Sequence, residues 1–170
     1  MEYLIFLRLI HIVCAVIWAG SMIYFAVFMI PAAKILGPGG YKFIQQLSGT
    51  KKLPVTMVVT ATLTIITGIL LMLKLFGRFR TEWFSSTHMI LLISGGILSL
   101  TGYIIGLIVN ITVSRRMSAI GKSLARSGTG PAAEQSSELQ ILQKRSFAAT
   151  TVIAILLFAS LILMSIVKYY

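Results

Sequence analysis

The chain has 170 residues, of which 57% are hydrophobic and only 11% are charged, and its net charge is +11. Soluble domains are about 25% charged and disordered chains have low hydrophobicity, so this composition excludes both classes. One cysteine and two histidines exclude a disulfide scaffold and a zinc finger. The positive charge lies between long apolar runs, which indicates loops that face anionic lipid and no nucleic-acid partner.

Four apolar runs are each long enough to cross a bilayer core of ~30 Å as a helix. They lie at about residues 3–33, 53–76, 83–113 and 146–167. None has the short alternating segments of an outer-membrane barrel. We therefore expect an all-α fold, an integral membrane up-down four-helix bundle that forms a single domain over residues 1–170. The first run is too long for a signal peptide and is expected to be retained.

Turn-forming residues mark the ends of the runs. Pro31 and the cluster Gly37-Pro38-Gly39-Gly40 are expected to end the first run, and Pro54 suits a first helical position of the second. Residues 114–145 are expected to form a polar cytoplasmic connector. Within it, residues 127–137 read as a flexible turn, and helical extensions of the neighbouring spans are expected on either side.

Lysine and arginine are distributed unevenly between the two sides of this bundle. The segments that join spans 1 to 2 and spans 3 to 4 hold ten of them, against five on the opposite side. Cytoplasmic loops carry an excess of these residues. Both connecting segments are therefore expected in the cytoplasm and both termini outside, in the inner membrane of a prokaryotic cell.

The two histidines are the strongest functional candidates, because ionisable groups inside a membrane are costly and are often functional. His11 lies about two turns inside the first span, and His88 lies one to two turns inside the third. These spans run in the same direction, so a similar depth in the outer leaflet is expected. Diagonal helices of a bundle are roughly 12–14 Å apart. Two imidazoles can hold the iron of one haem b per chain across such a gap. A methionine ligand is an alternative, since the chain has eight.

Basic residues near His11 suit a haem. Arg8 lies one turn before His11 and is expected to pair with a haem propionate, as arginine does with carboxylates. Arg78 and Arg80, in the expected outer loop, are further candidates for the same role. Arg8 can also simply extend to the membrane surface.

Small and aromatic residues complete the expected site. Trp18 lies seven residues after His11 and is expected to form its floor. Gly95 is the first of several small residues on one helix face after His88, and this face leaves room for a porphyrin plane. The other members are Ser99, Gly102 and Gly106. By default such a face packs against another helix or forms a homodimer, and Trp18 can equally be a packing residue.

Other residues allow different readings. Thr56, Thr60 and Thr64 form a polar stripe in the second span that is expected to be structural. His11 and Cys14 have a spacing that can hold Cu(I), although a buried, inert thiol is the simpler interpretation. A membrane histidine can also do no more than hydrogen-bond across helices.

Several of these positions together resemble the CopD-like and HemJ-like membrane proteins. The segment LRLIHI at 7–12, followed by WAG at 18–20 and Phe25, resembles the opening helix of that family. Pro54, Trp83, His88 and the pair at 115–116 are similar to its later helices. The resemblance implies a four-helix haem b protein in which the histidine of helix 1 is an axial ligand. HemJ relatives are protoporphyrinogen oxidases, and CopD relatives are associated with copper handling.

The chain departs from the HemJ pattern at two places. Ile90 stands where that family has a functionally important lysine, and residues 144–146 read Lys-Arg-Ser where Asn-Glu is expected. The sequence therefore favours a b-type cytochrome with His11 and His88 as ligands, which exchanges electrons with a quinol or a small redox partner. An enzyme that oxidises tetrapyrroles, a copper-handling protein and a purely structural subunit are the alternatives. A homodimer is expected.

Overall fold

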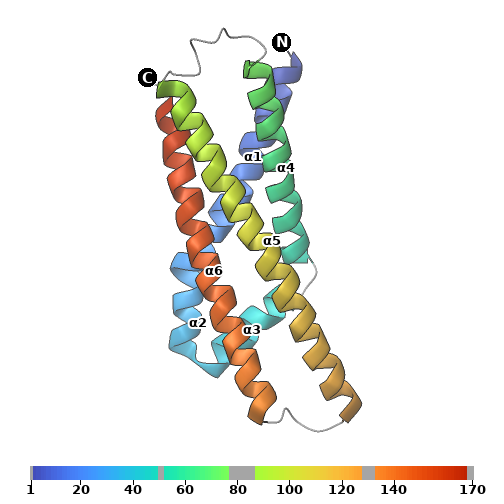
Figure 1. Ribbon diagram of the computed structural model, residues 1–170. Coiled ribbons are helices and arrows are strands. Elements are labelled where there is room, and N and C mark those ends of the chain that lie inside the picture. The colour runs from blue at the N-terminus through green and yellow to red at the C-terminus, as the bar shows by residue number, and fades with distance from the viewer. Residues whose placement is uncertain (1, 50–51, 77–86, 128–132, 168–170) are drawn as a thin grey trace.

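A computed structural model describes residues 2–49, 52–76, 87–127 and 133–167, which form helices and no strand. Four helical segments are long and apolar enough to cross a membrane. The expected all-α architecture of four membrane-spanning helices is therefore confirmed (Figure 1). In chain order, the elements are α1 (Glu2–Tyr24), the π-helical turn η1 (Phe25–Met29), α2 (Ile30–Leu36), α3 (Pro38–Gly49), α4 (Lys52–Phe76), α5 (Thr87–Ser127) and α6 (Ala133–Ile166).

The long helices form two antiparallel pairs. α1 packs along α4, and α5 packs along α6, while α6 also contacts α1. α4 and α5 touch each other much less. The start of α1 and the end of α6 lie at one end of the bundle, and α2 and α3 lie toward the other end (Figure 1). α1 and α5 are thus on a diagonal, as expected for spans 1 and 3.

The largest core cluster joins three of the long helices. Trp18 and Ala19 of α1 meet Ala61 of α4, and all three pack against two residues of α6, Ile153 and Leu157. The outer surface is covered by exposed aliphatic and aromatic side chains such as Val16 and Ile155. A water-facing surface rarely carries so much continuous apolar area, so this belt indicates a lipid bilayer environment.

A π-helical turn carries the first span past a proline. Pro31 lacks a backbone N–H, and its ring conflicts with the carbonyl four residues earlier in a regular α-helix. In η1 the N–H of Ile30 instead donates to the carbonyl of Phe25, five residues back. The expectation that Pro31 helps to end this helix is therefore wrong, because the wider turn absorbs the proline and the helix continues to Leu36.

The segment expected as a loop after span 1 contains a further helix. Only Gly37 forms the turn, with φ = 60°, a conformation that favours glycine. Pro38 begins α3, where a missing N–H has no cost. A Cβ on Gly40 would lie 2.6 Å from the backbone of Ala33, so this glycine allows α3 to fold closely against α2. The buried Ile44 of α3 then completes a second core cluster with Ile30, Ala33 and Phe147.

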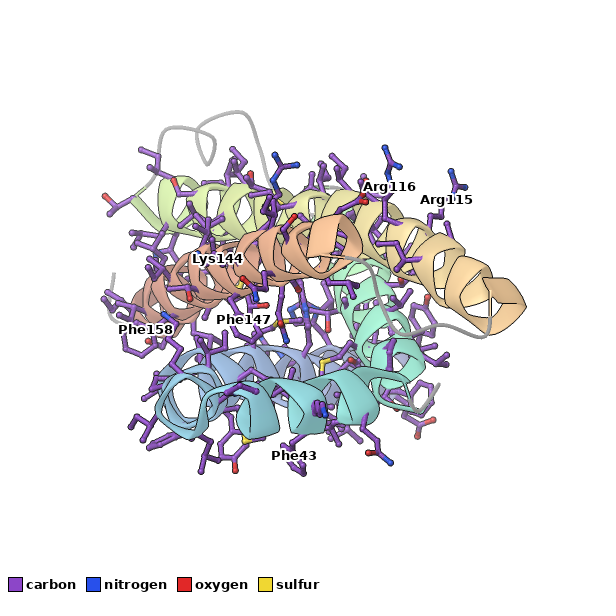
Figure 2. All side chains as sticks on the ribbon, turned by 90° about the horizontal axis from the view of Figure 1, so that it is seen from below. Phe43, Arg115, Arg116, Lys144, Phe147 and Phe158 are labelled. Atoms are coloured by element: carbon purple, nitrogen blue, oxygen red, sulfur yellow. The ribbon has the colours of Figure 1, made fainter. Side chains whose placement is uncertain are left out.

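α5 and α6 extend well beyond a membrane. With 41 residues, α5 is about 60 Å long, roughly twice the bilayer core. Of the expected connector at 114–145, the described part is helical on both sides, and residues 133–137, expected in the turn, belong to α6. Alanine, glutamate, glutamine and leucine are frequent there, and they favour helix. Figure 2 shows Arg115 and Arg116 pointing outward from this extension, whereas Phe147 points toward α2 and α3.

Candidate functional site

His11 is anchored to α4. Its Nδ1 lies 2.9 Å from the backbone carbonyl oxygen of Thr64 and 3.1 Å from Oγ1 of Thr67. The imidazole also lies directly over Gly68, where a Cβ would come within 2.9 Å of the ring carbon Cε1. The half-buried histidine of span 1 therefore reaches across to the second span, through a contact that only a glycine permits.

These contacts fix the tautomer of the neutral ring. A carbonyl oxygen only accepts hydrogen bonds, so Nδ1 must carry the proton that is donated to Thr64. The hydroxyl of Thr67 donates to the carbonyl of Leu63 at 2.6 Å, which leaves its lone pair to accept from Nδ1 as well. The lone pair of His11 is consequently on Nε2, which makes no hydrogen bond to any residue that the structure describes.

The threonines of α4 satisfy their own hydroxyls. Thr60 donates to the carbonyl of Thr56, and Thr64 donates to that of Thr60, each at 2.8 Å. The stripe at 56, 60 and 64 is thus largely internal to α4, as its structural interpretation expects. The sequence did not indicate two further contacts of His11, Thr67 and Gly68. They continue the same helix face, which is the signal that could have indicated the partner of His11.

Two residues near His11 in sequence take different positions. Cys14 is a buried free cysteine on the same inward face of α1. Arg8 is exposed, beside this face and one turn nearer the start of α1. Among the described residues, no three histidine, cysteine, aspartate or glutamate side chains gather where they could bind a metal.

The register of the bundle separates the two histidines. The rings of Trp18 on α1 and Tyr103 on α5 meet edge to face, with their centroids 6.3 Å apart. His11 precedes Trp18 by seven residues, whereas His88 precedes Tyr103 by fifteen. At about 1.5 Å per residue, the half-buried His88 lies about 12 Å farther along the bundle than His11. This difference in register favours His11 alone as the candidate ligand, and a haem held by both histidines stays a prediction.

The small-residue face of α5 is occupied by α6. A Cβ on Gly95 would lie 3.0 Å from Cγ of Met164, and one on Gly102 would contact Ile153. Ser160 of α6 also donates to the carbonyl of Gly95 at 2.7 Å. Gly95 therefore serves helix packing here and does not border an open slot for a porphyrin. The expected homodimer stays a prediction, and a second chain would have to contact another face.

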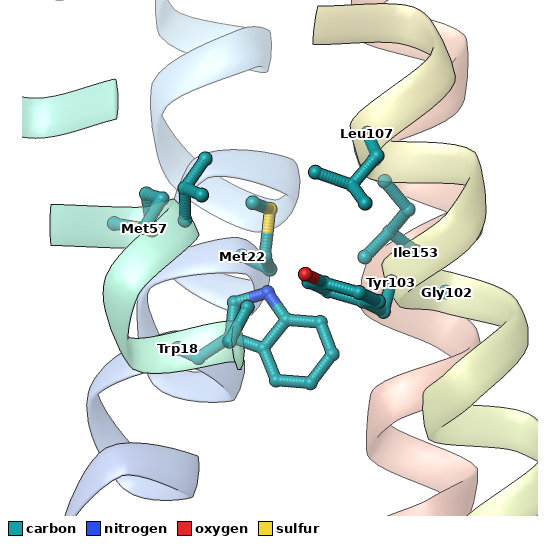
Figure 3. A pocket seen from close by; sticks show the side chains of 10 residues that line it. Trp18, Met22, Met57, Gly102, Tyr103, Leu107 and Ile153 are labelled. Carbon is teal, nitrogen blue, oxygen red and sulfur yellow. The ribbon is translucent and has the colours of Figure 1, made fainter. Parts of the chain in front are cut away.

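A pocket opens in the middle of the bundle (Figure 3), beside Trp18, which follows His11 by about two turns of α1. Its walls come from all four long helices and include Trp18, Met22, Met57 and Tyr103. The empty volume is about 340 Å³, which includes space that is open to the surroundings. Trp18 was predicted as the floor of a site, whereas Tyr103, whose ring meets Trp18 edge to face, was not predicted.

Some expected site residues lie outside the described residues. These are Arg78 and Arg80, together with Trp83. Comparison of the chain with family models, with curated proteins and with solved structures gives no match. The functional interpretation therefore rests on the geometry of His11 and of the central pocket.

Proposed function

We propose that the protein is a membrane b-type haem protein in which Nε2 of His11 would hold the iron. The observation that carries this proposal is the hydrogen bond from Nδ1 to the carbonyl of Thr64. Metal-binding histidines almost always donate their other ring N–H to a carbonyl, a carboxylate or water, which fixes the ring orientation and raises the basicity of the ligand. His11 has this arrangement within a membrane span.

The residues around His11 have separate roles in this proposal. The backbone carbonyl of Thr64 and the hydroxyl of Thr67 hold the imidazole in one orientation. Gly68 provides the room for the ring. Arg8, one turn nearer the end of the bundle, is the candidate partner for a propionate. Bound haem would supply one-electron chemistry between ferric and ferrous iron, with a quinol as the proposed membrane-soluble partner.

His88 is assigned no ligand role in this proposal. Two residues that hold the same iron must approach it together, and counted from the contact of Trp18 with Tyr103, His88 lies eight residues, or about 12 Å of helix, farther along than His11. This differs from the expectation that both histidines bind one haem, and it makes a direct test possible.

The test is an absorption spectrum of the purified protein in mild detergent, before and after dithionite. Sharp α and Soret bands are expected in the reduced wild type and in His88→Ala, and their loss is expected in His11→Ala. If the spectrum of the wild type shows no such bands and added haemin does not produce them, the haem assignment is overturned. His11 is then a helix-packing residue. Loss of the bands in His88→Ala alone would overturn the choice of ligand.

We also propose that both ends of the chain face the outside of a prokaryotic inner membrane. The support is the excess of lysine and arginine in the segments of α2 to α3 and of the α5 and α6 extensions. Cys14 is the only cysteine, so Cys14→Ser gives a background for single-cysteine labelling. In this background, a membrane-impermeant maleimide added to intact cells should label Thr87→Cys and spare Ala119→Cys, both at exposed positions. The opposite pattern would reverse the topology.

A further inference from the structure

We infer that the central pocket between the helix pairs binds the ring of a membrane-soluble quinol. The pocket lies within membrane-spanning segments, with Trp18 on α1 and Tyr103 on α5. A ligand that enters from the bilayer must itself be soluble in lipid. This inference rests on the proposed function in one respect, which is that a quinol is chosen among the compounds that carry a ring and a hydroxyl group.

Trp18 supplies a hydrogen-bond donor. Its side chain is 3% exposed, yet none of the hydrogen bonds between described residues uses its indole N–H. No buried side-chain nitrogen or oxygen of the described residues lacks a partner, so this N–H cannot be sealed in the core. It must open onto the pocket. Figure 3 shows the indole nitrogen on the edge that faces Met22 and the hydroxyl of Tyr103.

Tyr103 supplies a hydrogen-bond acceptor. Its hydroxyl oxygen lies 2.9 Å from Oγ1 of Thr62. The hydroxyl of Thr62 already donates its one proton to the carbonyl of Val58 at 2.7 Å. Tyr103 must therefore be the donor toward Thr62, and its oxygen keeps lone pairs that can accept a proton from a ligand. The pocket thus presents one donor and one acceptor close together.

The rest of the pocket suits a single apolar ring. The remaining lining is aliphatic or thioether, and the flexible side chains of Met22 and Met57 adapt to ring-shaped ligands. Gly102 and Gly106 add no side chain to the wall.

The two polar groups discriminate between the reduced and oxidised forms of such a ligand. A quinol hydroxyl can donate to Tyr103 and accept from Trp18 at the same time. A quinone carbonyl can only accept, so it satisfies Trp18 and leaves Tyr103 unused. The pocket should therefore prefer the quinol, and Tyr103→Phe should remove that preference.

Fluorescence of Trp18 tests this inference without reference to haem. Trp83 is the only other tryptophan, so Trp83→Phe makes Trp18 the sole reporter in the full-length protein. Titration with a short-chain benzoquinone should quench Trp18 along a saturable curve. The matching benzoquinol should displace the quinone and reverse the quenching. The benzoquinol concentration needed should be several-fold lower for the protein that keeps Tyr103 than for Tyr103→Phe. Val58→Phe, which fills the pocket, should abolish the saturable part.

A lipid-facing reporter controls for quinone that only dissolves in the micelle. Phe158 is 56% exposed on α6, and Figure 2 shows it at the outside of the bundle. Phe158→Trp in a background of Trp18→Phe and Trp83→Phe should show linear quenching. Equal, linear quenching of both reporters would overturn the inference. Because His11→Ala should leave the saturable curve intact, a failure of the haem proposal and a failure of this one give different results.

Discussion

Gly68→Ala tests whether the orientation of His11 controls a metal ligand. The added Cβ would lie 2.9 Å from Cε1 and 3.4 Å from Nδ1 of the imidazole, and the first distance is too short to be tolerated. The ring must therefore move away from α4. Movement lengthens the hydrogen bond from Nδ1 to the carbonyl of Thr64, now 2.9 Å, and it redirects Nε2.

The effect on stability and the effect on ligand binding should differ in size. Loss of one hydrogen bond costs about 0.5–1.5 kcal/mol. Replacement of glycine by alanine within a helix gains about 0.5–1 kcal/mol. These terms nearly cancel, so the free energy of unfolding should change by less than about 1 kcal/mol. Loss of an outer partner of a metal ligand typically lowers metal affinity about 10–100-fold, and we expect a loss in this range for haem.

Two measurements on the same samples separate these effects. Haemin titration followed by absorbance gives the affinity, and reversible unfolding in mixed micelles gives the stability. Gly96→Ala is the matched control, because a Cβ there meets nothing within 4 Å. Nitrogen-15 spectra of the imidazole report the Nδ1–H tautomer independently of haem. If Gly68→Ala bound haemin as tightly as Gly96→Ala, the argument that α4 orients an iron ligand would be refuted.

Three further substitutions test the packing at equilibrium. Gly40→Ala should destabilise the protein by about 1–3 kcal/mol, because the added Cβ would lie 2.6 Å from the backbone of α2. Gly39→Ala should not destabilise it, because a Cβ there meets open space. Unfolding in micelles measures the stability of both variants. Ser160→Ala removes the buried hydrogen bond from α6 to α5 and should lower the free energy of unfolding by about 0.6 kcal/mol. Ser165 bonds only within α6, so an equal decrease in Ser165→Ala would contradict this prediction. Glu138→Gln should change stability by less than about 0.5 kcal/mol, since its ion pair on the helical extension is exposed and 3.9 Å long; a larger loss in the same assay would contradict this.

The four spans could be predicted because each depends on one strong property, a run of apolar residues as long as a bilayer is thick. The details between them depend on tertiary contact. α3 was expected as part of a loop, since glycine and proline at 37–40 are typical of a turn. Its helix is stabilised by burial of Ile44 against α2 and α6, which no local pattern indicates.

The candidate site was predicted in part, for a similar reason. Trp18 and His11 were both identified, and the structure places both on the inward face of α1. Hydropathy gives the length of a span, but it gives neither the rotation of a helix nor its register against another helix. Depth counted from the ends of the runs made His11 and His88 equal, whereas their spacings from the contact of Trp18 with Tyr103 differ by eight residues.

The π-helical turn η1 has a consequence for how tolerant the chain is to insertion and deletion. A turn of this kind holds one residue more than an α-helical turn, so everything after it is rotated by about 100°. That rotation brings Ile30 and Ala33 of α2 to the side where Phe147 lies. Deletion of a single residue between Phe25 and Met29 would turn η1 into a regular α-helical turn and leave Ile30 and Ala33 facing Phe147. Insertion of a further residue there would instead turn both side chains away from Phe147 and detach α2 and α3 from α6.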